Sequence, residues 1–293
     1  MREAAVRIVD VTADTLGPVQ AFLERHRETS LFLLSNLGAF GPRAGDSLYS
    51  GDFNAVVDEQ GVCAVFCLTR GGNLVVQAGG RAELADEIEA ACASGPVPVQ
   101  GLLGEWDVAR AIWEVLCARR RVTTTRDAKE ILYRLSLTNH AMPSVGPLGE
   151  RVRMLTVDDF DEWDRLALAF HAEQVLPVQG RPHDRRAVFA RAAGLDHWWG
   201  AWHDGRLVAI ASFNALSGST GQVGGVHTVP DQRRLGWSRA VMQTLIRDAA
   251  TRHGVDLLIL FTGEDDVGPQ VLYESLGFVR VGHFGLFFGH VRP

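Results

Sequence analysis

The stretch of sequence that decides the fold is GGVHTVPDQRRLGWSRAVMQTLI, residues 224–246. Its pattern predicts a strand that ends near Val229, a turn that begins at Pro230, and an amphipathic helix over about 235–253. The first turn of a helix has backbone N–H groups without intrahelical acceptors, and the helix dipole adds positive potential at the same end. This order of elements therefore predicts an anion site at the start of the helix.

The residues between the predicted strand and helix suit a phosphate group. Gly236 and Ser238 are small enough to let a bulky anion reach the backbone. Arg233, Arg234 and Arg239 give the segment positive charge, against the sign of the whole chain. As a bare string, Arg-x-x-Gly-x-small is a weak signal, because roughly one match arises by chance at average residue frequencies. The position between a strand and a helix gives the match its weight.

The rest of the second half alternates between strand and helix patterns. The run VDLLILF is apolar throughout, which is typical of a strand buried on both faces. The other expected strands cover about 151–156, 197–203, 206–213 and 221–229, with FVRVG and FGLFFG as two closing strands, and the other expected helices cover about 158–174, 184–193 and 267–276.

A similar pattern occurs in both halves of the chain. VRIVDVTAD starts at Val6 and VRMLTVDD starts at Val152. Two hairpin signatures, FNAVVDEQGVCAVF and WGAWHDGRLVAIASF, follow at similar distances. We interpret this as a duplicated α/β unit; a chance likeness is the alternative, since hairpins are common. The predicted domains are 1–140 and 151–293, joined by a linker over 141–150 with prolines and glycines.

The composition is that of an ordinary globular protein. Of the 293 residues, 46% are hydrophobic and 22% are charged, which suffices for a core in each half. The net charge is −6 and neither half is basic, so we expect no nucleic-acid partner. No apolar run reaches the ~18 residues of a membrane span, and the N-terminus has no apolar signal segment. We therefore expect a cytoplasmic protein without a membrane partner.

The four cysteines all lie in the first half. Cys63 and Cys67 fall in VCAVFCL, a predicted buried strand, where a spacing of four residues places both on the same side. We interpret them as buried thiols rather than metal ligands or redox groups. The sequence contains no His-Glu zinc motif, Walker loop or GxGxxG fingerprint, and we expect no metal.

A second motif, LYESLGF over residues 272–278, follows the anion loop and the buried strand. Together the two motifs resemble those of the GNAT acyltransferases, and the resemblance covers about 151–293. It implies two tandem GNAT-like domains of α/β (α+β) class, each a mixed, mostly antiparallel twisted sheet flanked by helices. Ser238 and Asp266 depart from the family's usual residues. The first half has LVVQAGGRAELADEI in place of the loop motif, so it resembles a degenerate copy.

The resemblance also implies acetyl-CoA (CoA) as co-substrate. Its pantetheine arm would pair with a strand that parts from its neighbour at a bulge, and the adjacent Gly224 and Gly225 suit such a bulge. A backbone N–H near Thr228 or Val229 would polarise the thioester carbonyl. The residues implied around the cofactor are His227, Thr228, Val229, Arg233, Arg234, Leu235, Gly236, Trp237, Ser238, Arg239 and Asp266.

The chemistry implied by the resemblance is direct attack of an amine on the thioester. Tyr273 would be the general acid for the departing thiolate. The general base stays open: His227, Glu173 and His171 are candidates, and a water chain is the alternative. The tryptophans around the second hairpin are more typical of a core than of a cleft.

These residues together imply transfer of an acetyl group from acetyl-CoA to a primary amine of a small molecule or peptide, within a ternary complex. One alternative is acylation of an amino-sugar conjugate, as in mycothiol synthase. Another is a non-catalytic CoA-binding sensor or scaffold. A homodimer is one conceivable assembly.

Overall fold

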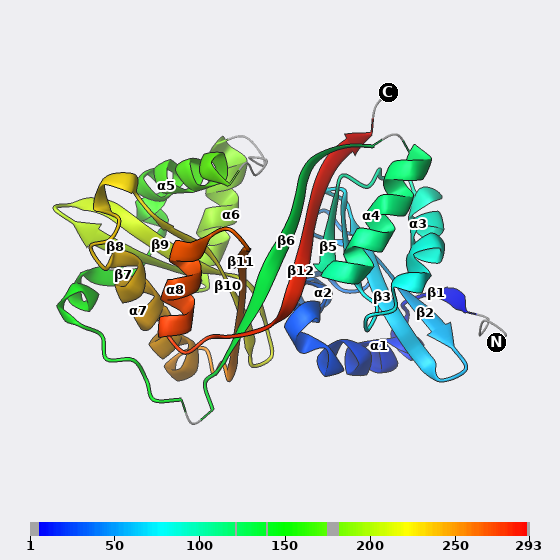
Figure 1. The fold of residues 1–293 in the computed structure, drawn as a ribbon, viewed down its shortest axis with the longest axis horizontal. Coiled ribbons are helices and arrows are strands. Elements are labelled where there is room, and N and C mark those ends of the chain that lie inside the picture. Colours follow the sequence, from blue (N-terminus) through cyan, green and yellow to red (C-terminus); the bar gives the residue numbers. More distant parts are fainter. Residues whose placement is uncertain (1–5, 121, 139, 175–181, 292–293) are drawn as a thin grey trace. The chain divides into compact units, whose positions relative to one another are not determined.

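The computed structural model describes residues 6–120, 122–138, 140–174 and 182–291. The chain forms two compact units (Figure 1). Unit 1 comprises Met1–Tyr133 and two later segments, Phe261–Val267 and Arg280–Pro293, and unit 2 comprises Arg134–Leu260 and Gly268–Val279. The C-terminal segment is therefore part of unit 1. Within the described ranges, no helix is long and apolar enough to cross a membrane.

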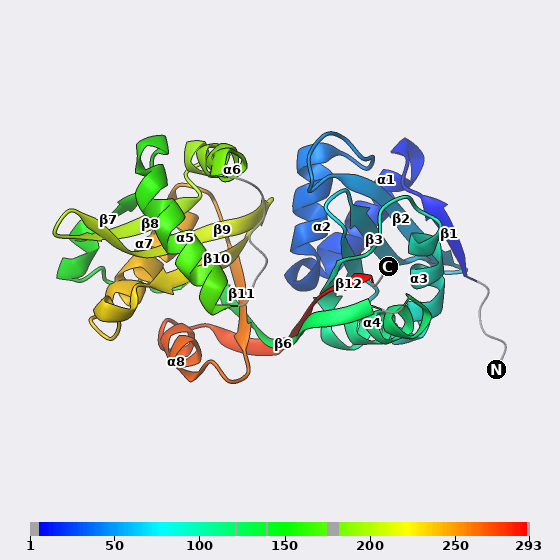
Figure 2. The ribbon, with the colours of Figure 1, turned by 90° about the horizontal axis from the view of Figure 1, so that it is seen from above.

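Unit 1 has a mixed sheet with helices on both faces. Its strands are β1 (Arg7–Asp10), β2 (Gly51–Asp58), β3 (Gly61–Thr69), β4 (Asn73–Gln77), β5 (Gly101–Glu105), β6 (Val122–Ser136) and β12 (Val279–Val291), in the order β1-β2-β3-β4-β5-β12-β6. Its helices are α1 (Ala13–Arg25), α2 (Arg27–Phe40), α3 (Ala85–Ala93) and α4 (Trp106–Arg120). Figure 2 shows α1 and α2 on one face of this sheet and α3 and α4 on the other. Each face carries its own hydrophobic core, around Phe53 and Val65 beside α1 and α2, and around Phe66 and Ile88 beside α3 and α4.

Unit 2 repeats this architecture. Its strands are β7 (Val152–Met154), β8 (Trp198–His203), β9 (Arg206–Ser217), β10 (Thr220–Thr228) and β11 (Leu257–Gly263), in the order β11-β10-β9-β8-β7. Its helices are α5 (Phe160–Glu173), α6 (Pro182–Gly194), α7 (Trp237–Thr251) and α8 (Val267–Ser275). Helix α5 packs on β9 and β10, and α7 packs on β8, β9 and β10. The expected α/β class with a mixed sheet flanked by helices is confirmed.

Both halves of the chain have the same succession of elements: a strand, two helices, three strands, then helix, strand, helix and strand. Each places a threonine capping box after its first strand, at Thr12 and at Thr156. The predicted hairpins are β2–β3 and β8–β9, with Gly61 and Gly205 in their turns at φ of 114° and 76°. The two expected closing strands are one continuous strand, β12, because no turn interrupts the backbone between them.

Cys63 and Cys67 lie on opposite faces of β3, so the expectation that they share a side was wrong. Cys63 belongs to the core beside α3 and α4, and Cys67 to the core beside α1 and α2. The cause is a β-bulge, since the register between β2 and β3 shifts after Val56 and makes Cys63 the extra residue. Both thiols are buried as predicted, and burial raises the pKa of Cys67 to about 12.

The start of α5 is fixed by hydrogen bonds to one carboxylate. Arg153 of β7 donates from Nη1 and Nη2 to the two oxygens of Asp159, each at 2.7 Å. The backbone N–H of Thr156 donates to the same carboxylate at 2.8 Å. The Arg153 guanidinium holds the pKa of Asp159 below its usual value. These bonds set the starting position of the helix that carries Glu173 at its other end.

Asp159→Ala should lower the free energy of unfolding by about 1–3 kcal/mol, because a largely buried carboxylate loses several hydrogen bonds. Thermal unfolding followed by circular dichroism measures the loss. Asp158→Ala, at an exposed neighbour, is the matched control and should stay within about 0.5 kcal/mol. Because the pKa of Asp159 is lowered by folding, its contribution exists above the ordinary carboxyl pKa and is lost as the pH falls. Equal melting temperatures for the two variants would contradict this assignment.

Candidate functional site

The two central strands of unit 2 part from each other. β10 pairs with β11 in parallel over Thr220–Gln222, whereas its antiparallel pairing with β9 continues to Thr228. The N–H of Val229 donates to the carbonyl of Val208 at 3.0 Å, on the β9 side. Successive residues of a strand point their backbone groups to opposite edges, so the N–H and C=O of Thr228 face the edge that β11 has left. An extended ligand could pair with the backbone at this edge.

The same geometry settles which backbone amide faces that edge. The sequence left Thr228 and Val229 as two candidates for a donor to a carbonyl. The amide of Val229 is already engaged by Val208, so that part of the expectation was wrong. Thr228 is the residue whose amide points away from β9.

The expected bulge is present at Gly224 and Gly225. The register between β9 and β10 shifts between Gly224 and His227, and Gly225 has φ of 60°. A Cβ on Gly225 would lie 3.1 Å from the ring of Trp198. A left-handed backbone conformation against a tryptophan favours glycine both conformationally and sterically. The bulge therefore fixes the direction of the strand that leads to His227.

The loop after β10 leads directly into the N-terminus of α7. Pro230–Gln232 form a 3-10 turn, and Arg234 and Gly236 both have left-handed φ, of 64° and 92°. The N–H of Ala240 donates to the carbonyl of Gly236 at 3.0 Å and closes the first turn of the helix. The amides just before Ala240 therefore have no intrahelical acceptor and are available to an anion.

Side chains hold this loop to the end of β10. The hydroxyls of Thr228 and Ser238 are 2.6 Å apart, so the strand end and the first turn of α7 are hydrogen bonded. Arg233 donates from Nε to the carbonyl of Thr228 at 3.0 Å. Trp237 is buried and donates from its indole to Gln232 at 3.2 Å. The loop is therefore set before any ligand binds.

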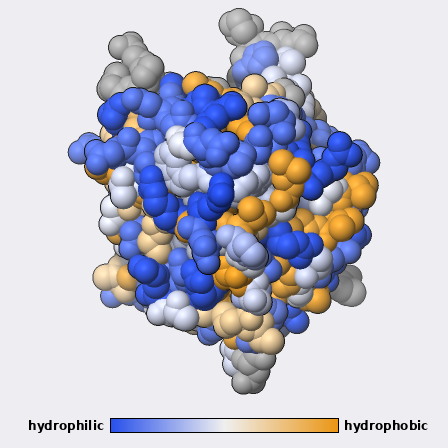
Figure 3. Space-filling model, turned by 90° about the vertical axis from the view of Figure 1, so that its left-hand side faces the viewer, coloured by the Kyte–Doolittle hydropathy of each residue, from blue (hydrophilic) through white to orange (hydrophobic). Residues whose placement is uncertain are grey.

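The outer residues of the loop remain exposed. Leu235 is 58% exposed, and Arg234 is exposed without an ion pair among the described residues. Figure 3, which faces the left-hand side of Figure 1, shows a mostly hydrophilic surface with separate hydrophobic areas. Arg239 donates to the hydroxyl of Ser275 in α8 at 2.8 Å. All three arginines expected to supply charge are exposed, and among the described residues Arg234 is the one whose side chain has no hydrogen-bond partner.

Two of the predicted base candidates meet at this loop. Nη2 of Arg233 lies 2.8 and 2.6 Å from the two carboxylate oxygens of Glu173. Nδ1 of His227 lies 3.8 Å from Oε2 of the same carboxylate. The ring of Phe170, one turn before Glu173 on α5, packs edge-on against His227 at 5.9 Å. Phe170 is not among the residues predicted from the sequence, although helical spacing from Glu173 places it on the same face.

His227 is the most enclosed polar residue of the site. It is 5% exposed, and its Nε2 has no hydrogen-bond partner among the described residues. Burial lowers the pKa of His227; Glu173 opposes this shift and Arg233 adds to it. The imidazole is therefore neutral at neutral pH. An unpaired buried nitrogen costs free energy unless a ligand pairs with it, so this atom is a candidate contact for a substrate.

The other predicted site residues lie on α8, on α5 and in unit 1. Tyr273 is buried in α8, and its ring packs against Phe278 at 6.0 Å. His171, on α5, lies beside Phe170 with ring centroids 5.9 Å apart. Asp266 belongs to unit 1, and its role in the site stays a prediction.

Unit 1 has the same parting of strands, with a different loop. β4 pairs with β5 in parallel only over Asn73–Val75. The turn that follows has two left-handed glycines, and their amides are already bonded: Gly79 to the side-chain carbonyl of Gln77 at 2.7 Å, and Gly80 to the carboxylate of Glu105 at 2.9 Å. Protein oxygens thus occupy the positions that an anion would take.

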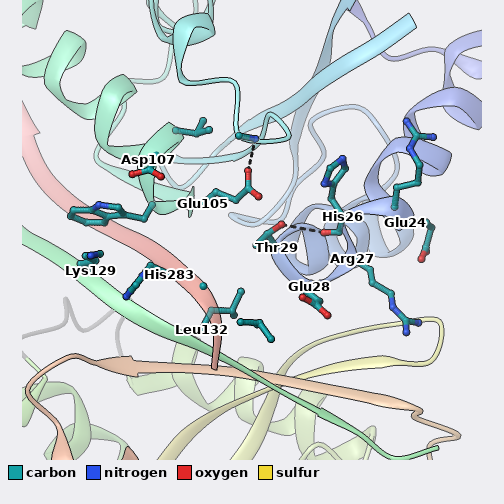
Figure 4. Close-up of a pocket in the computed structure, with 16 residues that line it drawn as sticks. Glu24, His26, Arg27, Glu28, Thr29, Glu105, Asp107, Lys129, Leu132 and His283 are labelled. Atoms are coloured by element: carbon teal, nitrogen blue, oxygen red, sulfur yellow. Dashed lines mark hydrogen bonds between the residues drawn. The ribbon is translucent and has the colours of Figure 1, made fainter. Parts of the chain in front are cut away.

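A cavity of about 680 Å³ lies beside this turn in unit 1 (Figure 4). Its lining includes His26, Glu105, Trp106, Lys129 and His283. Lys129 and His283 both pair with Glu264, at 3.4 and 3.1 Å. The cavity therefore combines acidic and basic groups.

Comparison with known proteins identifies a family for the region that contains this site. Residues 160–278 match the family described as "Acetyltransferase (GNAT) family". This region contains β10, the loop, α7, β11 and α8. Residues 160–278 therefore form a GNAT-family domain. Comparison with curated proteins gave no match.

Solved structures with this fold extend over the whole chain. A GCN5-related N-acetyltransferase from Sphaerobacter thermophilus has a TM-score of 0.59 at 14% identity, covering 98% of this chain and 96% of that one. A Drosophila protein has a TM-score of 0.66 at 16% identity, covering 98% and 99%. A tandem GNAT protein from the clavulanic acid biosynthesis pathway has a TM-score of 0.52 at 16% identity, covering 99% of each chain. At these identities the likeness establishes the fold alone.

Gly225→Ala should destabilise the protein by about 1–2 kcal/mol, because an alanine at φ of 60° is strained and its Cβ would press on Trp198. The melting temperature measures the effect. Gly268→Ala is the matched control, since a Cβ there meets no atom within 4 Å. A Gly225→Ala variant that melts with the control would show that the bulge tolerates a side chain.

Proposed function

We propose that this protein is an N-acetyltransferase that moves an acetyl group from acetyl-CoA to a primary amine of a small molecule or peptide. The observation that carries the proposal is the parting of β10 from β11 beside a helix N-terminus with unpaired amides, inside the region that matches the GNAT family. Such a place offers an extended ligand a strand edge and offers its phosphates a helix end.

The residues present fit acetyl-CoA. The amide of Arg233 is bonded to the carbonyl of Pro230 at 3.4 Å, so the amides from Arg234 to Ser238 would hold the pyrophosphate. Arg234 adds an exposed positive charge beside them. The edge of β10 at Thr228 would pair with the pantetheine arm. Bound acetyl-CoA would supply a thioester as the acyl donor. The Thr228 amide faces the open edge and is the donor that would polarise the thioester carbonyl.

His227 is the general base that we favour among the candidates. A base needs a free nitrogen that is unprotonated at working pH and screened from water. His227 has all three properties, through its unpaired Nε2, its lowered pKa and its burial. Its Nε2 would accept the proton of the attacking amine. Glu173 faces Nδ1 and would stabilise the resulting imidazolium.

The first half of the chain would not hold a second acetyl-CoA in the same manner. The glycine amides of its turn are bonded to Gln77 and Glu105, and a carboxylate at this position repels phosphate. This supports the interpretation of unit 1 as a degenerate copy with another role. We expect one acetyl-CoA per chain.

Ser238→Asp tests the phosphate position. An acidic residue in the first turn of α7 suits the helix dipole and should leave the fold intact, but it would repel a phosphate. Acetyl-CoA affinity should fall about tenfold or more, measured by isothermal titration calorimetry. Gln60→Glu, in the exposed β2–β3 turn, adds the same charge elsewhere and should leave the affinity unchanged. Equal affinities for the two variants would contradict binding of the phosphate at the start of α7.

Tyr273→Phe tests the proposed general acid for the thiolate. We expect kcat to fall by about tenfold to a hundredfold, with acetyl-CoA affinity within about twofold of wild type. Release of CoA thiol with a panel of amines, measured across a range of pH, gives the readout. Tyr49→Phe, at an exposed tyrosine in unit 1, is the control. An unchanged kcat at every pH would exclude this role, and binding without turnover of any amine would favour a CoA sensor.

A further inference from the structure

The Glu173 carboxylate lies between a guanidinium and an imidazole. Arg233 reaches both of its oxygens, at 2.8 and 2.6 Å, whereas Nδ1 of His227 is 3.8 Å from Oε2. A separation of 3.8 Å is too long for a hydrogen bond. Glu173 therefore hydrogen bonds to Arg233, and among the described residues no acceptor lies within hydrogen-bond distance of Nδ1 of His227.

Arg233 weakens the ability of Glu173 to stabilise the protonated form of His227. A carboxylate close to an imidazole favours its protonated form, and a nearby cation disfavours it. The guanidinium neutralises the carboxylate and also repels an imidazolium directly. Phe170, which packs edge-on against the ring, offers no charge. Within the part of the chain that the structure describes, the two charged groups that act on His227 are Glu173 from α5 and Arg233 from the loop.

Arg233 is placed so that a ligand can compete for it. Its side chain is 45% exposed, and it starts the loop whose amides we assign to the cofactor phosphates. A half-exposed ion pair contributes little net stability, typically ~0–1 kcal/mol. A pyrophosphate at the neighbouring amides would carry more negative charge than one carboxylate and would compete with Glu173 for the guanidinium.

On the basis of the function proposed above, we propose that Glu173 exchanges partners when the anionic cofactor binds: Arg233 turns to the phosphates, and Glu173 turns to Nδ1 of His227. Arg233 is then a positioning residue that couples cofactor binding to the strength of the base. The base is weak in the free protein and becomes stronger once the acyl donor is in place. A proton moves from solvent to His227 in part of the population when the cofactor binds.

Proton uptake on binding is a direct readout of this exchange. Acetyl-CoA is titrated into the wild-type protein at a pH near 6.5, in buffers of different ionisation enthalpy. The dependence of the observed heat on the buffer gives the number of protons taken up. We expect net proton uptake to be higher in the wild type than in Glu173→Gln, because the phosphate of the cofactor contributes equally to both. Glu150→Gln, at an exposed glutamate in unit 2, should match the wild type.

A second measurement uses the free protein and needs no cofactor. The His227 ring is titrated by NMR, its signal assigned by its loss in His227→Asn. Arg233→Gln should raise the pKa of His227 because Glu173 is released to it, and Glu173→Gln should lower that pKa further. Opposite shifts in these two variants would show that both groups act on His227, which the exchange requires; the exchange itself is read from the proton uptake.

Some outcomes would overturn the proposal. Equal proton uptake in the wild type and Glu173→Gln would do so, as would an unchanged His227 titration in Arg233→Gln. If acetyl-CoA fails to bind at all, the proposed function and the cofactor-driven exchange both fall. The NMR titration of His227 needs no cofactor, so it would still show whether Glu173 acts on both Arg233 and His227.

Discussion

Parallel pairing between β10 and β11 stops at Gln222, and the arrangement of unit 2 around the site depends on this stop. Buried backbone groups need hydrogen-bond partners, so a strand that leaves its neighbour in the interior must find others. One of these backbone groups, the carbonyl of Thr228, accepts a hydrogen bond from Arg233. The amide of Thr228 at this edge is the group that we propose pairs with a ligand. The bulge, the loop and the helix start all follow within a few residues of this opening.

The two halves show how one scaffold can lead to different chemistry. Both separate their central parallel strands after a few paired residues, and both follow with left-handed turn residues. In unit 2 the amides lead into a long helix and stay available. In unit 1 Gln77 and Glu105 bond the corresponding glycine amides. The difference is local and depends on a few side chains, whereas the sheet and its order of elements are shared.

Local patterns in the sequence were enough to predict the loop before α7, the bulge at Gly224 and Gly225, and both hairpins. These features depend on glycine, proline and apolar spacing within short windows. The sides occupied by Cys63 and Cys67 were missed because a single extra residue in β3 reverses the alternation, and nothing in VCAVFCL marks it. The pairing of Arg233 with Glu173 was missed because it joins residues 60 positions apart. The membership of β12 in unit 1 has the same cause, since strand partners are set by the whole fold.

The last strand has a consequence for how the protein is made. β12 pairs with β5, over Phe284–Phe288 and Gly101–Glu105, so the sheet of unit 1 includes residues from the C-terminal end of the chain. A ribosome makes those residues after the residues of unit 2. The first half therefore leaves the ribosome with an open edge at β5, and this edge is covered only after unit 2 has been synthesised. The sheet of unit 1 is begun before unit 2 and completed after it.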